Sequence, residues 1–510
     1  MKSNKIINIV SKPGIILFIV CTMISFVFLL LCSRSSFLYP YNNWDDANSY
    51  FSMGKFMING GVIYRDLYDQ KGPYLYLIYG IAYLLSNNTF LGVFFLEILS
   101  ISFFLFFGYK ILCLYTTAVV AYSLLPLLAA AGLSSLSFYW GGAAEEFCLP
   151  FLMASLYCSL KYLKEDYPAS PRLSMILWNG IFAGVILQLK YTLLGFYFAW
   201  MAVIALLNLT KMNWKKAIRC CLVFLGGMIV TMIPWLFYFG IHGALDDWFQ
   251  CYVYNNVFLY SDIQKADTTI LLKIYKLAKI LYNLVWNNIS YFCFIVIGFY
   301  FMIFSSFNHW YEKINTVLLF GFLFLGIYVG GGDIFYYSIP LMIFSVLGLG
   351  AIGRGINKVE RKLGISFNEK LYLFLFFLTM IGGVCFANEN SINTDYRKVE
   401  KKDHFLWEFE KIVNSEENPT LLNINMLDSG LYTVANILPT CKYFQTNGID
   451  LEEMRREQER YIREGETLFV ISRFEYPEYI LENYELIAET TFPTDGKNES
   501  PYFLFRLRNR

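Results

Sequence analysis

The sequence is poor in the residues that build metal centres and disulfide frameworks. It has only three histidines, and His242, His309 and His404 lie far apart, which argues against a histidine-rich zinc site. The 11 cysteines fall mostly in apolar stretches, and none are spaced as CxxC. Cys441 is the only cysteine after residue 387, so the C-terminal part cannot hold an internal disulfide. We predict no metal site and no certain cofactor, and the question of a divalent cation stays open.

Charge is also scarce, at 16% of the residues, whereas 56% are hydrophobic and the mean hydropathy is +0.45. Apolar runs of about 20 residues recur, which is the length that crosses a bilayer core. The pattern predicts an α-helical polytopic membrane protein with about 11–13 spans. The expected spans are 14–33, 90–110, 113–133, 146–163, 174–190, 192–209, 217–239, 287–306, 314–330, 335–353 and 371–387.

The charges are unevenly distributed along the chain. Residues 1–387 hold 26 Lys+Arg and 17 Asp+Glu, whereas residues 388–510 hold 15 and 23. This shift predicts a membrane domain over 1–387 and a soluble domain over 388–510. In the latter, 421–427, 467–472 and 502–508 are typical of strands, and 450–464 is typical of a charged helix, so we expect a small α/β domain.

Basic clusters set the expected orientation. With the N-terminus inside, Lys161, Lys164 and Arg172 share the inner side with the clusters at 211–219 and 354–362, in agreement with the positive-inside rule. Loop 34–73 and the domain 388–510 are then outside, in a multi-pass protein of a cell membrane, by expectation the bacterial plasma membrane. Residues 74–86 are apolar but only 13 long, and we interpret them as a re-entrant or tilted partial helix.

The longest polar stretch of the first 230 residues is 41–73, which follows the first span and contains a helical pattern at 46–59. Long loops of this kind are kept for function more often than for packing. Asp45 and Asp46 open the helical pattern. One of them has an alternative role as a helix cap, but two adjacent carboxylates exceed that need, and the second can act as a general base.

The same loop ends with basic and acidic residues just before the apolar segment. Lys71 and Arg65 are candidates for holding a lipid phosphate, with snorkelling to bulk lipid as the alternative. Asp66 and Asp69 are candidates for substrate binding.

Three further outer segments carry candidate residues, for substrate binding in the first and third and for the donor phosphate in the second. Glu145 and Glu146 open a span, where the helix dipole is the alternative explanation. Lys190 lies at a bend within an apolar region and is a second candidate for the phosphate, with snorkelling to bulk lipid as the alternative. Asp333, Tyr336 and Tyr337 follow three glycines, and an interfacial aromatic belt would also explain the tyrosines.

Together these segments resemble the GT-C superfamily of membrane glycosyltransferases, and most of all its branch of protein mannosyltransferases and aminoarabinose transferases (glycosyltransferase family 39-like). The resemblance covers about residues 14–387. It is carried by Asp46-xxx-Tyr50, GGVIYRDLYDQKGP at 60–73, the glutamates at 145–146, LKYT at Lys190, and Tyr-Tyr-xx-Pro at 336–340. Family members often have His-Tyr where this chain has Tyr336-Tyr337.

The resemblance implies a catalytic carboxylate in the first outer loop, which falls on Asp46 with Asp45 as its rival. It also implies a polyprenyl-phosphate sugar donor whose phosphate meets Lys71, and an extracytoplasmic acceptor such as a cell-surface glycan, glycolipid or protein. Transfer would invert the anomeric carbon. The alternatives are a non-enzymatic transporter or lipid-linked sugar flippase, and a polysaccharide polymerase. Few charges lie inside the spans and there is no internal repeat, which disfavours a transporter. No nucleic-acid partner is expected.

Overall fold

A computed structural model describes residues 13–259, 269–330, 332–364, 369–449, 451–493 and 499–508 of the chain. These residues divide into two compact units. Unit 1 contains the described residues of Met1–Ser33, Glu97–Ile233 and Asp267–Thr394, and unit 2 contains those of Arg34–Leu96, Pro234–Ala266 and Asp395–Arg510.

Each apolar stretch expected to span the membrane is helical. The helices are α2 (Pro13–Cys32), α5 (Leu91–Leu112), α6 (Ala118–Leu133), α7 (Ala144–Lys161), α8 (Leu173–Leu187), α9 (Leu194–Leu209), α10 (Trp214–Ile241), α14 (Ile289–Phe304), α15 (Trp310–Tyr328), η5 (Phe335–Phe344) with α16 (Ser345–Leu363), and α17 (Glu369–Asn390). Seven helical stretches of the described chain are long and apolar enough to cross a membrane, or eight if the bent pair of α13 (Ile270–Asn287) and α14 is one span. The prediction of an α-helical polytopic membrane protein is confirmed.

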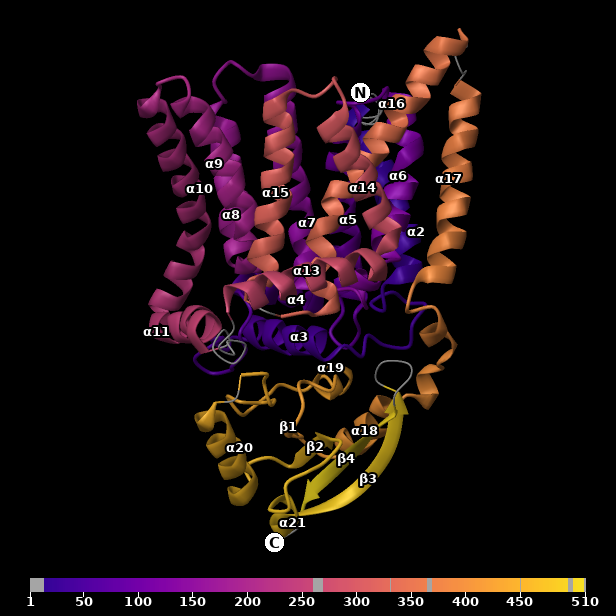
Figure 1. The fold of residues 1–510 in the computed structure, drawn as a ribbon. Coiled ribbons are helices and arrows are strands. Elements are labelled where there is room, and N and C mark those ends of the chain that lie inside the picture. The colour runs from indigo at the N-terminus through magenta and orange to yellow at the C-terminus, as the bar shows by residue number, and fades with distance from the viewer. Residues whose placement is uncertain are drawn as a thin grey trace, which may run out of the picture. The chain divides into compact units, whose positions relative to one another are not determined.

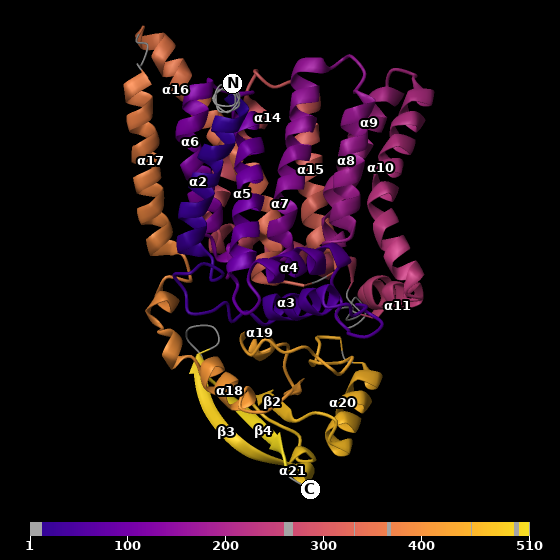
Figure 2. The same cartoon turned by 180° about the vertical axis from the view of Figure 1, so that it is seen from behind.

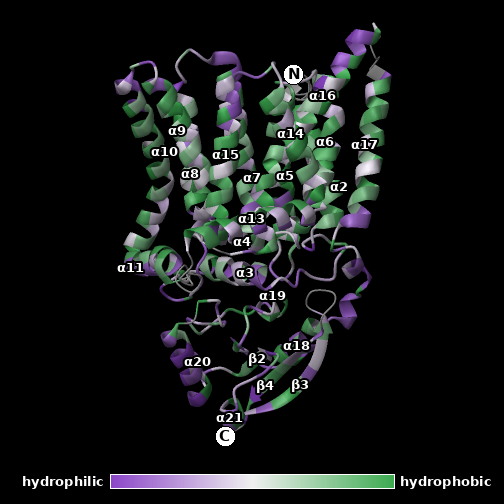
Figure 3. Ribbon diagram, in the orientation of Figure 1, coloured by the Kyte–Doolittle hydropathy of each residue, from purple (hydrophilic) through white to green (hydrophobic). Residues whose placement is uncertain are grey.

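Close backbone contacts hold the bundle of unit 1 together. Helices α14 and α16 cross where a Cβ on Gly298 would lie 2.6 Å from the backbone nitrogen of Gly348. A Cβ on Gly195 of α9 would likewise lie 2.0 Å from the carbonyl oxygen of Phe322 in α15. Small residues at such crossings let helices pack without side chains between them. Figure 1 and, from behind, Figure 2 show α6 beside α16 and α17, and Figure 3 shows that hydrophobic residues cover most of the helices of unit 1.

Two elements of unit 1 differ from the simple expectation of one straight helix per apolar run. Helix α13 is amphipathic and meets α14 at an angle of 111°. The expected span 335–353 begins with the 3₁₀ segment η5, which contains Pro340, and continues as α16 to Leu363 through a basic last turn.

Unit 2 contains the helices of the long polar loop. Helix α3 (Asp45–Ile58) matches the helical pattern expected at 46–59, and α4 (Pro73–Leu85) matches the short apolar segment. The two pack so closely that a Cβ on Gly54 would lie 2.4 Å from the backbone nitrogen of Gly80. With 13 residues, α4 is about 20 Å long, which is short of a bilayer core of about 30 Å. The short α11 (Leu245–Trp248) and the π-helical η4 (Phe249–Leu259) belong to the same unit.

The C-terminal part of unit 2 is built on a four-stranded sheet in the order β1-β2-β4-β3. Its strands are β1 (Leu421–Ile424), β2 (Phe469–Arg473), β3 (Tyr484–Pro493) and β4 (Glu499–Leu507), and only β1 and β2 pair in parallel. The helices are α18 (Phe405–Val413), α19 (Leu431–Val434), α20 (Glu452–Glu464) and α21 (Ile480–Asn483). The small α/β part expected from the sequence is therefore present.

Candidate active site

The predicted catalytic pair lies in the first turn of α3. Trp44 occupies the N-cap position, and no side chain there accepts a hydrogen bond from the helix. Asp45 and Asp46 follow it as the first two helical residues, both half-buried. Neither aspartate is the N-cap residue, so helix capping does not explain the acidic pair. The helix dipole does favour negative charge at this end.

The two aspartates differ in their surroundings. Asp45 forms an ion pair with Arg473 at the end of β2, with 2.8 Å between Oδ2 and the guanidinium. Burial raises the pKa of the Asp45 carboxyl, while the charge of Arg473 works against this effect. Asp45 is thus held in a contact with the end of β2.

Asp46 shares a face of α3 with Tyr50, because residues four apart stack on one side of a helix. The ammonium of Lys71 lies 5.9 Å from the centre of the Tyr50 ring. Lys71 itself is held through its backbone, since its N–H donates to the Tyr76 hydroxyl at 2.9 Å and its carbonyl accepts from the Tyr64 hydroxyl at 2.6 Å. The structure thus brings the predicted base and the predicted phosphate ligand to one region of unit 2.

Asp69 is the buried acid of this region. One carboxylate oxygen accepts from the Tyr76 hydroxyl at 2.8 Å and the other from the Asn447 amide at 2.9 Å. Burial raises the pKa of the Asp69 carboxyl, the charge of Lys71 lowers it, and the charge of Asp46 raises it. Asp69 therefore lies within electrostatic reach of both Lys71 and Asp46.

Arg65 and Asp66 form a separate pair at the surface of the same loop. The guanidinium contacts the carboxylate at 2.6 Å, with 42% and 35% of the side chains exposed, and also donates to the His242 carbonyl at 2.8 Å. The hydrogen bond from Arg65 lowers the pKa of the Asp66 carboxyl. Asp66 also accepts from the backbone N–H of Val62 at 3.0 Å, so this pair shapes the loop.

Unit 1 contains a second cluster of predicted residues. Lys190 forms an ion pair with Glu145 at 2.8 Å, with 11% and 1% of the side chains exposed. The Lys190 ammonium also lies 4.1 Å from the centre of the Tyr337 ring. Segments that are far apart in the sequence, at 145, 190 and 337, are therefore in contact, and Lys190 has a carboxylate partner rather than only bulk lipid.

The other predicted residues of unit 1 lie near the members of this cluster in the sequence. Glu146 is buried and accepts from the Gly142 N–H at 2.9 Å. Tyr336 is buried, with its ring 5.1 Å from that of Tyr337 and 6.3 Å from that of Tyr139. Asp333 is exposed.

Several residues of the C-terminal part that hold α3 have no local sequence pattern that would reveal them. Asp428, which is buried, accepts from Ser52 at 2.5 Å and from the Gly430 N–H at 2.8 Å. Lys55 donates to the carbonyls of Tyr432 and Ile437 at 3.2 and 3.0 Å. Arg473 holds α3 through Asp45, and Asn447 holds Asp69 in the loop before α4. The excess of polar residues in α3 is the one local indication that this helix has such partners.

No group of three or more His, Cys, Asp or Glu residues in the described parts of the chain is arranged to hold a metal ion.

Comparison with known proteins finds a likeness in structure alone. No family model matches the sequence, and no curated protein matches it. The crystal structure of ArnT from Cupriavidus metallidurans in the apo state superposes with a TM-score of 0.60 at 12% identity, covering 96% of this chain and 97% of that one. The same protein bound to undecaprenyl phosphate gives 0.58 at 13% identity, with the same coverage.

The archaeal oligosaccharyltransferase AglB from Archaeoglobus fulgidus, in complex with an inhibitory peptide and a dolichol-phosphate, gives a TM-score of 0.50 at 11% identity over 92% of this chain and 70% of that one. The agreement with ArnT extends over nearly the full length of both chains. The chain therefore has the fold of ArnT, in agreement with the fold that the resemblance to the GT-C superfamily implies.

Proposed function

We propose that the protein is a membrane glycosyltransferase that moves a sugar from a polyprenyl-phosphate donor to an extracytoplasmic acceptor. The observation that carries the proposal is the grouping of Asp46, Tyr50, Asp69 and Lys71 around α3, which sets a carboxylate beside a cation. The fold supports it, because ArnT, one of the proteins that share it, has been crystallised with undecaprenyl phosphate.

In the proposed reaction, Asp46 takes the proton from an acceptor hydroxyl as that oxygen forms a bond to the anomeric carbon. The bond between the anomeric carbon and the phosphate oxygen breaks, and the lipid phosphate leaves with the electron pair. Lys71 stabilises the charge that develops on the phosphate, as positioned cations do at leaving groups. A single displacement of this kind inverts the anomeric centre.

Asp69 has the role of a positioning residue in this scheme. Its two oxygens are already occupied by Tyr76 and Asn447, and its charge faces Lys71. We infer that Asp69 fixes the lysine and the backbone turn before α4.

Lys190 is a second candidate for the phosphate. Its contacts with Glu145 and Tyr337 fix the ammonium in a nearly buried place, where a charge interacts strongly. Glu146, Asp333 and Tyr336 are proposed substrate contacts of the same unit, and Arg65 and Asp66 are proposed contacts of unit 2.

The test is a transfer assay with purified full-length protein, a polyprenyl-phosphate sugar and extracts of cell-envelope acceptors. Asp46→Asn keeps the shape of the side chain but cannot accept a proton, so we expect transfer to fall by about 10²–10⁴-fold. Asp45→Asn is the matched control and should cost less. Near-normal transfer in Asp46→Asn contradicts the assigned base, and absence of any transfer from the unmodified protein contradicts the enzyme.

A further inference from the structure

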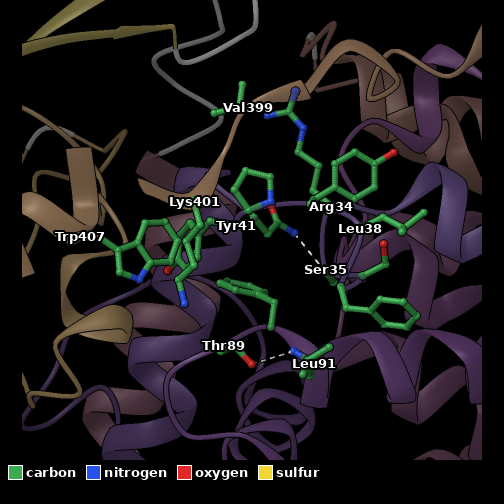
Figure 4. Close-up of a pocket in the computed structure, with 15 residues that line it drawn as sticks. Arg34, Ser35, Leu38, Tyr41, Thr89, Leu91, Val399, Lys401 and Trp407 are labelled. Carbon is green, nitrogen blue, oxygen red and sulfur yellow. Dashed lines mark hydrogen bonds between the residues drawn. The ribbon is translucent and has the colours of Figure 1, made fainter. Parts of the chain in front are cut away.

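Unit 2 contains a cavity of about 350 Å³ that the proposed reaction does not use. Its walls come from three segments, residues 34–42 after the first span, 89–91 before α5, and 399–407 before and within α18. Figure 4 shows Arg34, Trp407 and Thr89 around it. A volume of this order suits a small ligand or a head group.

The charge on the cavity wall is entirely positive. Arg34 and Lys401 are its charged lining residues, and no carboxylate is found among the lining residues of the described chain. The Arg34 guanidinium lies 4.1 Å above the Tyr396 ring and donates to the Asn43 side chain, so it is fixed in place with 2% of its surface exposed. The Lys401 ammonium lies 4.6 Å from the ring of Trp407. Two cations so arranged favour an anion between them.

The remaining polar groups of the cavity also suit an anion. Hydroxyls of Ser35, Ser36 and Thr89 line the wall. Leu91, the first residue of α5, belongs to the lining, and its N–H donates to the Thr89 hydroxyl at 3.3 Å. The N-terminus of this 22-residue helix adds partial positive charge on the same side.

The rim of the cavity is apolar and exposed. Phe37 and Leu38 have 59% and 38% of their surfaces exposed. The Phe37 ring packs edge-on against Phe94 in the first turn of α5, with 6.1 Å between centroids. Because α5 is a candidate membrane span, an exposed apolar rim at its first turn lies at the level where lipid head groups meet acyl chains.

From this combination we propose that the cavity binds the phosphate-bearing head group of an anionic glycerophospholipid. Arg34, Lys401 and the N-terminus of α5 hold the phosphate, while Phe37 and Leu38 contact the acyl chains. This site is separate from Lys71 and does not depend on the proposed transfer reaction.

The experiment measures retention of dioctanoyl phosphatidylglycerol on the full-length protein by native mass spectrometry, beside dioctanoyl phosphatidylcholine and inorganic phosphate. We expect phosphatidylglycerol to bind at least about tenfold more tightly than phosphatidylcholine. Lys401→Gln removes one charge-assisted contact and should weaken binding about tenfold. Thr89→Trp fills the cavity and should abolish binding. Arg34 is buried against Tyr396, and its substitution would also disturb the fold. The test therefore relies on Lys401→Gln and Thr89→Trp.

Controls separate this cavity from other basic surfaces. Lys402 is adjacent in sequence but exposed and paired with Glu400 at 2.8 Å, so Lys402→Gln should change affinity less than about twofold. Equal affinity for both lipids, or unchanged binding in Lys401→Gln and Thr89→Trp, overturns the proposal. Complete displacement by an equal concentration of inorganic phosphate shows recognition of the anion alone and overturns the lipid assignment.

Discussion

At the scale of single residues, the adjacent aspartates of α3 show how one sequence signal can divide into two roles. Asp45 forms an ion pair with Arg473 at the end of β2, whereas the charge of Asp46 acts on Asp69. The first contact fixes the start of the helix, and that rigidity is what a positioned general base requires. The ion pair of Asp45 with Arg473 therefore supports the chemistry proposed for its neighbour.

We predict that Arg473→Gln destabilises the protein by about 1–3 kcal/mol, because it leaves the partly buried Asp45 carboxylate without its charged partner. Thermal unfolding of the purified protein in detergent measures the effect. Arg456 is the matched control, since it pairs with Glu452 while 77% of its side chain is exposed, and Arg456→Gln should be nearly neutral. Equal effects of the two substitutions would show that the Asp45 contact does not stabilise α3.

A second residue-scale prediction concerns the donor phosphate. Lys71→Gln should lower kcat/KM for the lipid-linked donor by about tenfold or more, since one charge-assisted contact is worth about 1.5–3 kcal/mol. Arg65→Gln is the comparison, because Arg65 is already engaged by Asp66 and the His242 carbonyl. A larger loss of kcat/KM in Arg65→Gln than in Lys71→Gln would make Arg65 the phosphate ligand in place of Lys71.

The sequence indicated candidate residues but not their partners. Asp46 and Lys71 stand out locally, because a polar loop after a membrane span is unusual and its charges are easily seen. Asn447, which holds Asp69, is 378 residues away, and the contact exists only because β1 and the segments after it fold beside α3. A long-range contact of this kind leaves no local pattern.

At the scale of elements, α3 is anchored by a buried polar network. Burial lowers the pKa of Lys55 to about 7, and burial raises the pKa of Asp428 to about 6. Between about pH 7 and 10.5 the unfolded chain keeps a proton on Lys55 that the folded chain has released, so this residue's contribution to stability rises with pH in that window. Asp428 has the opposite effect, because its contribution to stability falls as the pH rises from about 3.8 to about 6.

Lys55→Met should remove the pH-dependent contribution of Lys55. We predict that the stability of the wild type relative to this variant rises between pH 7 and 10, by up to about 1.4 kcal/mol per pH unit. Unfolding curves across this range give the slope. Lys398→Met, at a side chain that is 78% exposed, should show a much smaller slope. Parallel curves for the wild type and Lys55→Met would mean that Lys55 does not titrate in this window.

The apolar runs predicted the membrane helices well, and the periodic patterns of apolar and polar residues predicted most helices and strands of residues 388–510. The exceptions have physical causes. Strand β3 was missed because a register shift between Leu486 and Ala488 breaks the alternation of its buried residues. Helix α13 was missed as an element because its lysines interrupt the apolar run, although its hydrophobic residues recur with a helical period.

At the scale of the whole molecule, the charge composition and the compact units place the boundaries within the chain at different residues. The shift in charge at residue 388 predicts a separate C-terminal domain, and that boundary stays a prediction. The compact unit that contains the tail also includes Arg34–Leu96 and Pro234–Ala266. A unit assembled from three separated segments cannot be found from local composition, because each segment alone is too short to show the shared core.

The orientation of the chain is the last prediction, and it follows from the basic loops. Positive-inside bias places residues near Lys215 inside and the C-terminal part outside. Lys215 and Lys402 are both exposed, so a cysteine at either position can react. In a background that lacks the exposed Cys113, Cys293 and Cys385, Lys402→Cys should react with a membrane-impermeant maleimide in intact cells. Lys215→Cys should react only after permeabilisation. The opposite pattern would place the α3 region inside, where an extracytoplasmic acceptor could not reach Asp46.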